Sequence, residues 1–411
     1  MVVGAGAAGI IAAWRAASLG AKVVLLEKTP RLGTKILISG GGKCNITHDG
    51  PLEHVLRAFR PNEARFIRPA CYRFTNTQIV EMLTSRGLEV YTRPDGRIFP
   101  TEGTAKDVVA ILRSYLFDAG VEVRLNTPVS RILTEGGRVT GVETASGVVP
   151  SRQVIVAVGG SSYPNSGTTG DGFTWMRDLG HSIVRVRAAL APMTLSTPKT
   201  DLSGVALRDC ILKARQAGKE FVRWRGDTLL THHGVSGPTA LAISREVSEH
   251  RETGPVELET DLYPDESFEV LGARLASLVR LHPKRLIATH LEAELPDRIV
   301  PELLRQAAIA PDAVGTTFTQ KERNRLVEAL KGWKLGLVKV VVLDKGEVVA
   351  GGVALDEVDP HSMKSKLVDG LFLCGEVLDI AGPVGGYNLQ AAFATGYVSG
   401  ESAASIAGFS P

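Results

Sequence analysis

The chain has 411 residues, of which 44% are hydrophobic and 22% charged, and its formal net charge is +3. These values are typical of a soluble globular protein. A chain of this length is too long to fold around a single hydrophobic core, so we expect two or three domains. Lys and Arg are interspersed with Asp and Glu along the whole chain. This mixing argues against a basic stripe that binds nucleic acid and against a polybasic membrane anchor. We therefore expect a small-molecule substrate and neither a nucleic-acid nor a membrane partner, while the oligomeric state stays open.

The apolar runs are short: Leu337 to Leu343, one of the longest, is interrupted by Lys339 and cannot span a bilayer. A glycine motif begins at Gly4, so we expect no signal peptide; the three preceding residues are few for a strand, which suggests missing natural residues before Met1.

Four cysteines have no CxxC spacing and do not cluster with histidines. They predict unpaired thiols and a cytoplasmic location, and they argue against a disulfide reductase, which needs two cysteines beside its flavin. These cysteines are Cys44, Cys71, Cys210 and Cys374.

The first predicted elements form a dinucleotide-binding fingerprint. Val2-Val3-Gly4-Ala5-Gly6-Ala7-Ala8-Gly9 precedes an apolar helix to Leu19 and a second strand that ends at Glu27. Gly4 permits the tight turn, Gly6 lets a pyrophosphate approach the backbone, and Gly9 lets the helix pack on the sheet. The N–H groups of Ala7 and Ala8 would face the phosphates. Glu27 would bind the adenosine ribose and repel a 2′-phosphate, which argues against NADP at this site.

Further along, hydrophobic periodicity predicts two helices and then strands up to about Arg187. The turns at Glu135-Gly136-Gly137 and Ser146-Gly147 predict a small antiparallel meander between two elements of a parallel sheet. The helices are expected at 76–86 and 104–119, and the strands at 121–125, 129–133, 139–144 and 153–158.

From about Ala188 the pattern changes to short strands and then to consecutive helices, which is typical of an inserted domain. We expect strands at 207–225, 228–230 and 338–342, and helices at 268–281, 283–295, 296–310 and 319–330.

The last stretch returns to the first pattern. A buried strand at 370–374 ends in Gly375-Glu376, and a helix rich in small residues covers 389–404. These two elements would complete the opening sheet and make the nucleotide-binding domain discontinuous.

Three more glycine clusters favour a long ligand that touches several loops. They are Ser39 to Asn45, Ala157 to Gly160 and Gly385 to Gln390. FAD fits better than NAD alone. The strand at 370–374 ends in Gly375-Glu376, and an acid at that strand end can bind the ribityl chain of FAD. The helix that begins near Asn388 can then direct its N–H groups at the pyrimidine edge of the flavin.

Four motifs together resemble the BaiN-like flavoproteins, also called the aminoacetone oxidase family of FAD-binding enzymes. The resemblance covers essentially the whole chain. The motifs are Ser39-Gly40-Gly41-Gly42-Lys43-Cys44-Asn45, Gly159-Gly160-Ser161-Ser162-Tyr163-Pro164 with Gly167-Thr168-Thr169-Gly170-Asp171-Gly172, Thr231-His232-His233-Gly234-Val235-Ser236-Gly237-Pro238, and Gly375-Glu376 to Gln390.

The resemblance implies an α/β fold of the glutathione reductase class with non-covalent FAD. It implies an FAD domain at 1–187 and 345–411, and an insert at 188–344 with barrel strands at about 190–262 and 334–344 and a helical bundle at about 265–332. Lys43 stands where arginine is commoner in that family. Carried over by position, the expected FAD-binding residues are Gly4, Gly6, Ala7, Ala8, Gly9, Glu27, Lys28, Lys35, Ser39, Gly40, Gly41, Gly42, Cys44, Asn45, Val129, Gly159, Gly160, Gly375, Glu376, Gly386, Tyr387, Asn388 and Leu389.

Two residues are candidate proton donors. His233 could serve near the flavin or be a structural loop histidine, and Tyr163 could protonate an enolate or pack its turn before Pro164. For Cys44 a buried thiol is the favoured interpretation over flavin contact, and Asp379 is interpreted as a loop-ordering carboxylate. No metal site is expected.

We expect a cytoplasmic FAD-dependent oxidoreductase that passes hydride from NAD(P)H through flavin to a small acceptor such as an activated enone. One branch of the family resembles ene reductases that act on steroid-like enones. Since the sequence has no second GxGxxG motif, the pyridine nucleotide would bind transiently. The alternatives are an amine oxidase that uses oxygen, a flavin-binding sensor or assembly factor without turnover, and a module for NAD alone.

Overall fold

The computed structural model describes residues 1–408, and the chain divides into two compact units. Unit 1 combines Met1–Arg187 with the segment from Glu347 onward, and unit 2 is Ala188–Gly346. Each unit has its own hydrophobic core.

A five-stranded parallel sheet forms the centre of unit 1. The C-terminal strand pairs with β10, with Leu371 opposite Val154, so the prediction that the end of the chain completes the opening sheet is confirmed. The order is β19 (Leu371–Leu373), β10 (Val154–Val156), β1 (Val2–Val3), β2 (Val24–Leu26) and β6 (Glu122–Arg124).

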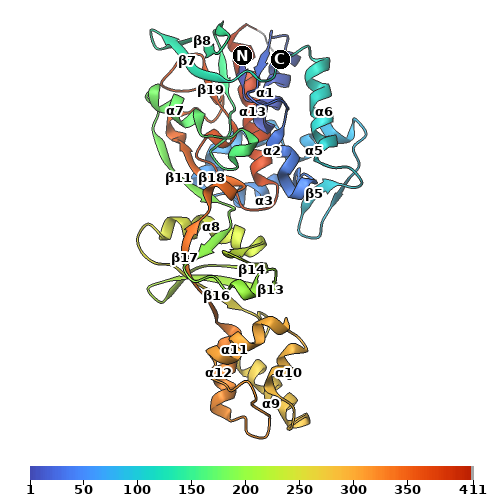
Figure 1. Ribbon diagram of the computed structural model, residues 1–411. Helices are drawn as coiled ribbons and strands as arrows, with labels where there is room; N and C mark the ends of the chain where they lie inside the picture. The colour runs from blue at the N-terminus through green and yellow to red at the C-terminus, as the bar shows by residue number, and fades with distance from the viewer. Residues whose placement is uncertain (409–411) are drawn as a thin grey trace. The chain divides into compact units, whose positions relative to one another are not determined.

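Helices α1 (Ala7–Ser18) and α13 (Tyr387–Ile406) lie side by side in unit 1 (Figure 1). Gly396 and Gly400 stand one turn apart on α13, and a Cβ added to either would lie 2.2 Å from a carbonyl oxygen of α1. Glycine at both positions therefore allows the two helix backbones to touch. This contact explains why the last helix is rich in small residues.

The remaining strands of unit 1 form small sheets. The predicted meander between β6 and β10 is confirmed as a three-stranded antiparallel sheet. A second small sheet has the order β3-β5-β4, and β11 joins β18. The bounds are β7 (Val129–Glu135), β8 (Arg138–Thr144), β9 (Gly147–Pro150), β3 (Thr47–His48), β4 (Val90–Thr92), β5 (Arg97–Pro100), β11 (Ile183–Ala189) and β18 (Val348–Val353).

Six further α-helices lie in the described part of unit 1. Two of them, α5 and α6, confirm predicted helices and begin directly after Thr75 and Thr104, whose side chains cap them. The bounds are α2 (Thr34–Ile38), α3 (Leu52–Arg57), α4 (Pro61–Arg73), α5 (Asn76–Thr84), α6 (Ala105–Asp118) and α7 (Asp171–Asp178).

Unit 2 contains a closed six-stranded barrel in the order β12-β15-β14-β13-β16-β17. The predicted strand at 207–225 is two strands, because the chain reverses at Ala217 (φ 50°) and Gly218 (φ 77°). Alanine rarely adopts this conformation, so the sequence did not mark the turn. The strands are β12 (Met193–Leu195), β13 (Ala206–Gln216), β14 (Lys219–Thr231), β15 (Gly234–Ser236), β16 (Glu257–Asp261) and β17 (Trp333–Val341).

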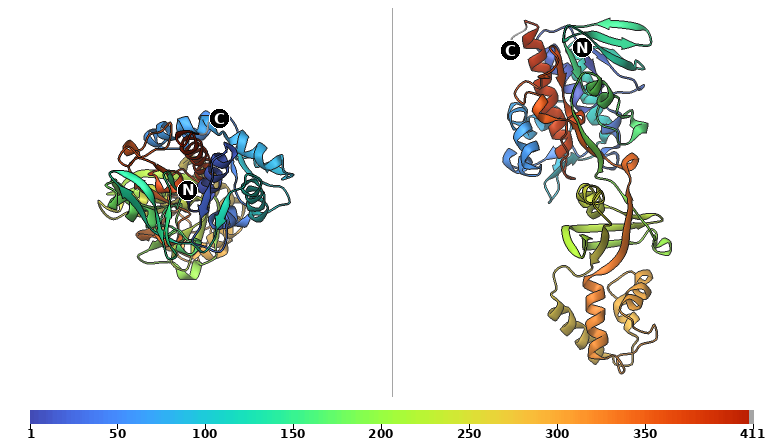
Figure 2. Two further views of the ribbon diagram at one scale, coloured as in Figure 1. Left: turned by 90° about the horizontal axis from the view of Figure 1, so that it is seen from above. Right: turned by 90° about the vertical axis from the view of Figure 1, so that its left-hand side faces the viewer.

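A group of helices adjoins barrel strands β16 and β17 within unit 2 (Figure 2). The helix predicted at 268–281 is confirmed, whereas those at 283–295 and 296–310 are much shorter than predicted. Leu286 has an extended conformation and forms a β-bridge with Val314, so the helix predicted at 283–295 begins only after this residue. The group consists of α9 (Phe268–Leu281), α10 (Ile287–Glu292), α11 (Val300–Gln306) and α12 (Gln320–Lys331). Helix α8 (Pro238–His250) packs separately, mainly on β14 and β13.

The unpredicted elements include helices α3, α4, α7 and α8 and strands β11 and β18. Helix α4 contains Pro69 in its interior and has few apolar residues, so its helical pattern is weak. Among the described residues, no helix is long and apolar enough to cross a membrane.

Candidate functional site

The glycine turn after β1 has the geometry of a backbone cradle. Gly4 has φ 96°, and a Cβ there would lie 2.6 Å from the Ala157 carbonyl oxygen. A Cβ on Gly9 would lie 1.8 Å from the Gly4 carbonyl oxygen. By contrast, a Cβ on Gly6 would meet no protein atom within 4 Å. Gly4 and Gly9 are therefore required by packing, whereas Gly6 borders open space that a ligand can enter.

The acid at the end of β2 lies against this turn. The Oε2 of Glu27 accepts from the Ala5 N–H at 2.7 Å, and its Oε1 accepts from the Thr29 N–H at 2.8 Å. These bonds hold the carboxylate at the turn and leave it further lone pairs for a ribose hydroxyl. Lys28 instead forms an ion pair with Asp171 at 2.7 Å.

The end of β19 meets the same turn. A Cβ on Gly375 would lie 2.9 Å from the Ala8 Cβ, and the Gly375 N–H donates to Thr395 Oγ1 at 3.0 Å. Residues 8 and 375 are thus in contact although far apart in sequence. The end of β19 and the start of α1 form one edge of the site.

Glu376 and Lys35 connect the N-terminal and C-terminal segments of unit 1. Lys35 Nζ lies 2.6 Å from Glu376 Oε2 and donates to Ser162 Oγ at 3.0 Å. Glu376 also accepts from the N–H groups of Val349 (2.9 Å) and Gly160 (3.4 Å). This network fixes both side chains and keeps the Gly159-Gly160 turn beside the carboxylate.

The third glycine cluster lies against β3. A Cβ on Gly386 would lie 2.7 Å from the Thr47 backbone, and Thr47 Oγ1 donates to Gln390 Oε1 at 2.8 Å. When the Asn45 side-chain amide is oriented with its oxygen toward Gly386, this oxygen accepts a hydrogen bond from the Gly386 N–H at 2.9 Å. The segments near residues 40 and 388 therefore lie side by side, as a single extended ligand would require.

The turn at 39–42 is built for backbone approach. Gly40 and Gly41 have φ 56° and 67°, and a Cβ added to Gly41 would meet no protein atom within 4 Å. Cys44, in contrast, is fully buried, and burial raises the pKa of its thiol to about 12. Its side chain belongs to the core, which matches the interpretation favoured from the sequence.

The remaining expected positions differ in what they offer a ligand. Val129 begins β7, two residues after Thr127, whose N–H donates to the Glu27 carbonyl. The Asn388 side chain accepts from the Gly382 N–H and donates to the Gly382 carbonyl, both at 2.8 Å. Asn388 therefore closes its own loop, and its backbone N–H is the group left for a ligand.

The starts of helices α1 and α13 fit the anionic parts of FAD. Helix α1 begins after Gly6 and α13 after Gly386, and in the described residues neither has a side-chain cap or an acid in its first turn. Their first N–H groups and dipoles thus favour anionic ligand atoms. With the open space at Gly6 and the acid at the end of β2, this donor set fits a dinucleotide whose phosphates meet α1 and whose polar ring edge meets α13.

The two expected proton donors lie in different units. Tyr163 belongs to unit 1, is 40% exposed and has φ 54°, a strained conformation for tyrosine. His233 lies in the exposed turn between β14 and β15 of unit 2, where its carbonyl accepts from Leu195.

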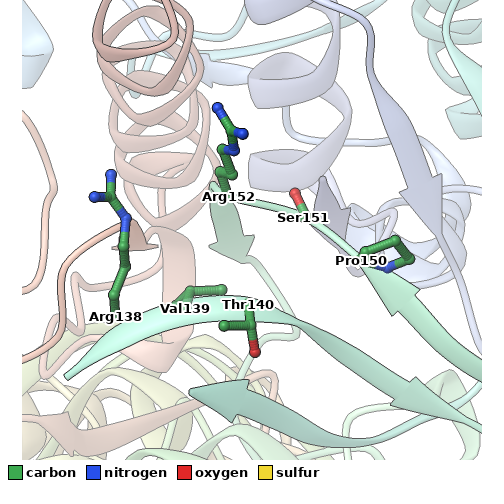
Figure 3. A pocket seen from close by; sticks show the side chains of 6 residues that line it. All are labelled: Arg138, Val139, Thr140, Pro150, Ser151 and Arg152. Atoms are coloured by element: carbon green, nitrogen blue, oxygen red, sulfur yellow. The ribbon is translucent and has the colours of Figure 1, made fainter. Parts of the chain in front are cut away.

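An open depression of about 580 Å³ lies over the meander and is lined by six residues (Figure 3). It borders the start of β10, whereas the glycine turns follow the carboxyl ends of the strands, so it is not the nucleotide cradle. The lining residues are Arg138, Val139, Thr140, Pro150, Ser151 and Arg152. Among residues 1–408, no group of three His, Cys, Asp or Glu side chains could hold a metal ion.

Residues 1–402 match the family described as the HI0933-like protein Rossmann domain. The chain belongs to this family of flavoproteins. It is 32% identical over 403 residues to a Haemophilus influenzae protein named ribosomal RNA dihydrouridine synthase, covering 97% of this chain and 96% of the relative. It is 30% identical to the 3-dehydro-bile acid delta(4,6)-reductase of Clostridium scindens, covering 98% of both chains.

Solved structures agree on the fold. The 3-ketosteroid delta1-dehydrogenase of Sterolibacterium denitrificans aligns with a TM-score of 0.55 and 15% identity, covering 98% of this chain and 99% of that one. The 3-ketosteroid-delta4-(5alpha)-dehydrogenase of Rhodococcus jostii aligns with a TM-score of 0.52 and 16% identity, covering 98% and 96%. At these identities the likeness concerns the fold alone. Family membership makes this chain an FAD-dependent oxidoreductase.

Sequence reasoning missed several residues that hold this HI0933-like site together. Thr47, Gln390 and Thr395 are buried and connect the strands to α13. Thr47 lies two residues after the motif Ser39 to Asn45 and Gln390 ends another motif, but a motif does not identify the partner of a side chain.

Proposed function

We propose that this protein reduces a carbon–carbon double bond conjugated to a carbonyl, with NAD(P)H as the electron donor. The observation that carries the proposal is a shared bond type among full-length relatives. A delta(4,6)-reductase of a 3-dehydro bile acid and a dihydrouridine synthase both bear names that describe reduction of an alkene in conjugation with a carbonyl. FAD supplies the hydride transfer when bound.

The chain's own residues support this reaction by positioning and by exclusion. The uncapped start of α13 stabilises negative charge at a polar ring edge. The ion pair of Lys35 with Glu376 fixes the end of β19 beside the Gly159-Gly160 turn. All four cysteines are unpaired and buried, and burial raises the pKa of Cys44, Cys71 and Cys374 to about 12, so a thiol relay is excluded.

The acceptor could be a small enone or a uridine in ribosomal RNA. The small-molecule acceptor is favoured by the even mixing of charges along the chain and by the bile-acid relative. The RNA acceptor is the second candidate, favoured by the Haemophilus influenzae relative and by a 29% identical Escherichia coli relative of the same name.

Anaerobic stopped-flow mixing with NADH and NADPH tests the donor. We expect one of them to bleach the visible flavin absorbance within the turnover time. If neither does so while dithionite does, the proposed donor is wrong; bleaching by amines instead would favour the amine oxidase alternative.

The acceptor is then tested by mixing the reduced protein with a steroid-type enone or with a transcript of ribosomal RNA. Return of the flavin absorbance with one and not the other decides between the two candidates. If oxygen reoxidises the protein and neither alkene does, the proposal of alkene reduction fails.

A further inference from the structure

We propose that Tyr387 is the acid that protonates the substrate carbon during alkene reduction, and that His48 positions it. This inference rests on the proposed function, because only reduction of a carbon–carbon double bond requires such a proton. Tyr387 was expected from the sequence only as a cofactor-binding residue.

The first support is the position of Tyr387 in the fold. It is the first residue of α13, so its backbone N–H belongs to the uncapped helix start that fits the flavin ring edge. Gly386, directly before it, packs on the Thr47 backbone. The phenol is therefore attached to the same helix turn that would hold the flavin.

The second support is the rigid placement of the ring. His48 stacks on Tyr387 with a centroid distance of 4.9 Å and an interplanar angle of 16°. Phe59 meets it edge-on at 6.2 Å and 83°. A Cβ on Gly385 would lie 2.3 Å from the Tyr387 ring, so glycine is required there. Three sides of the ring are thus fixed before any substrate binds.

His48 is itself fixed. Its Nδ1 lies 2.8 Å from the Asp49 carbonyl oxygen and its Nε2 lies 3.0 Å from the Asp95 carbonyl oxygen. A Cβ on Gly96 would lie 2.3 Å from the imidazole ring, so the hairpin turn closes tightly over it. Both partners are acceptors, and the neutral imidazole donates from one nitrogen only, so one hydrogen bond together with the close packing at Gly96 fixes His48 as a support for the phenol.

The third support is the free hydroxyl. Tyr387 Oη has no hydrogen-bond partner among residues 1–408, although the side chain is half-buried. Burial and then the charge of Asp95 raise the pKa of Tyr387, so the phenol keeps its proton at neutral pH. The hydroxyl oxygen is open to solvent and makes no hydrogen bond to the described part of the chain, so a substrate can approach it.

In the proposed reaction, a reduced pyridine nucleotide is the source of the two electrons and the hydride that the β-carbon receives, and FAD, when bound, would supply the hydride transfer. The carbon–carbon π bond breaks, the Tyr387 O–H bond breaks, and its proton forms the new bond at the α-carbon. Water then returns a proton to the phenolate oxygen.

The other two proton-donor candidates lack this placement. Tyr163 is 40% exposed, and no aromatic ring of the described residues packs on it. His233 is exposed on a turn of unit 2, and no side-chain contact of its imidazole fixes it within the described chain.

The first experiment tests whether Tyr387 lies near bound FAD, and its result does not depend on enzyme activity. The protein is labelled with 3-fluorotyrosine, and the Tyr387 resonance is assigned by its loss in Tyr387→Phe. We expect FAD added to the flavin-free protein to shift this ¹⁹F resonance and to leave that of exposed Tyr72 in place. An unmoved Tyr387 signal, with FAD bound by absorbance, would overturn the inference whatever the protein's substrate is.

The kinetic arm uses the same variant. In Tyr387→Phe we expect bleaching by the pyridine nucleotide to be unchanged and reoxidation by the alkene to be slower by about 100-fold or more, the range of general acid catalysis. Reoxidation by ferricyanide, which needs no proton at carbon, should keep its rate. The matched control is Tyr72→Phe, which should behave as wild type.

The positioning role of His48 is tested by His48→Ala and His48→Phe. We expect the alanine variant to lower the rate of alkene reoxidation and the phenylalanine variant, which keeps the stacking face, to restore part of it. Equal rates in Tyr387→Phe and wild type would overturn the acid role. If wild type reduces no alkene at all, the proposed function fails, and the ¹⁹F arm still decides where Tyr387 lies.

Discussion

The turns that open α1 and α13 look alike in sequence but differ in what they bring to the site. The turn at Gly4–Gly9 offers mainly backbone: Gly6 borders open space, and the turn carries no side chain larger than the methyl group of alanine. The turn at Gly382–Tyr387 offers the same uncapped helix start together with an aromatic side chain held by His48 and Phe59. A nucleotide can be bound by backbone alone, whereas chemistry at its ring requires a placed side chain.

Substitution of Gly9 has the largest expected effect. A Cβ there would overlap the Gly4 carbonyl oxygen at 1.8 Å, and neither backbone can move freely. We expect Gly9→Ala to destabilise unit 1 by about 3 kcal/mol or more and to abolish FAD retention. Thermal unfolding followed by circular dichroism measures the first, and absorbance of the purified protein measures the second. Wild-type stability would show that this turn is not packed as described.

Substitution of Glu376 should have the second-largest effect. Glu376→Ala leaves Lys35 and the N–H groups of Val349 and Gly160 without their shared partner in a partly buried site. We expect a loss of about 3 kcal/mol, because one half of a buried pair is removed. Urea unfolding measures it. Lys35→Ala should cost less, since Glu376 keeps both backbone donors, and the reverse order would contradict this assignment.

Gly6→Ala tests this comparison further, because it should weaken FAD binding without changing the stability of the protein. The backbone at Gly6 has φ −79°, which alanine tolerates, and the added Cβ meets no protein atom. We expect an unchanged melting temperature and an FAD dissociation constant raised by about 10-fold to 100-fold, which corresponds to about 1.4 to 2.8 kcal/mol. Fluorescence titration of flavin-free protein measures it.

The matched control is Gly272→Ala in α9 of unit 2, where a Cβ would make an ordinary contact with Val327. It should leave FAD affinity unchanged. Equal affinity in Gly6→Ala and wild type would mean that the phosphates do not approach this turn.

The smallest expected effect concerns acid stability. Glu401 on α13 pairs with Arg15 of α1 and Arg73 of α4. Burial alone would raise the pKa of Glu401, but the hydrogen bonds and charges of the two arginines outweigh it and hold the pKa below its usual value of 4.5. The pair therefore stabilises the protein fully above about pH 4.5 and loses this contribution as the pH falls further.

We expect Glu401→Gln to be less stable than wild type at neutral pH by about 1 to 2 kcal/mol and closer to wild type at low pH. Urea unfolding at a series of pH values between neutrality and 3 tests this. A constant difference across that range would contradict the linkage.

The sequence could predict the parts of unit 1 whose signals are local. The fingerprint at Gly4 to Gly9, the meander turns and the return of the sheet at 370–374 follow from glycine spacing and apolar periodicity, and the structure confirms them. Helix α4 was hidden by Pro69, and the β13–β14 turn by an alanine at φ 50°.

The candidate site was harder to predict because its contacts are long-range. The glycine clusters could be located, but not that Glu376 would pair with Lys35 or that Gly386 would lie on Thr47. The stacking of His48 on Tyr387 has no sequence signature, since it depends on a hairpin turn closing around the imidazole.

A crystal structure of the flavin-loaded protein tests the central claim most directly. We predict the pyrophosphate within hydrogen-bond distance, about 3 Å, of the N–H groups at Ala7 and Ala8, and the pyrimidine edge of the same flavin at the start of α13 beside Tyr387. Flavin bound away from either helix start, or density for a nucleotide that reaches only α1, would contradict the account.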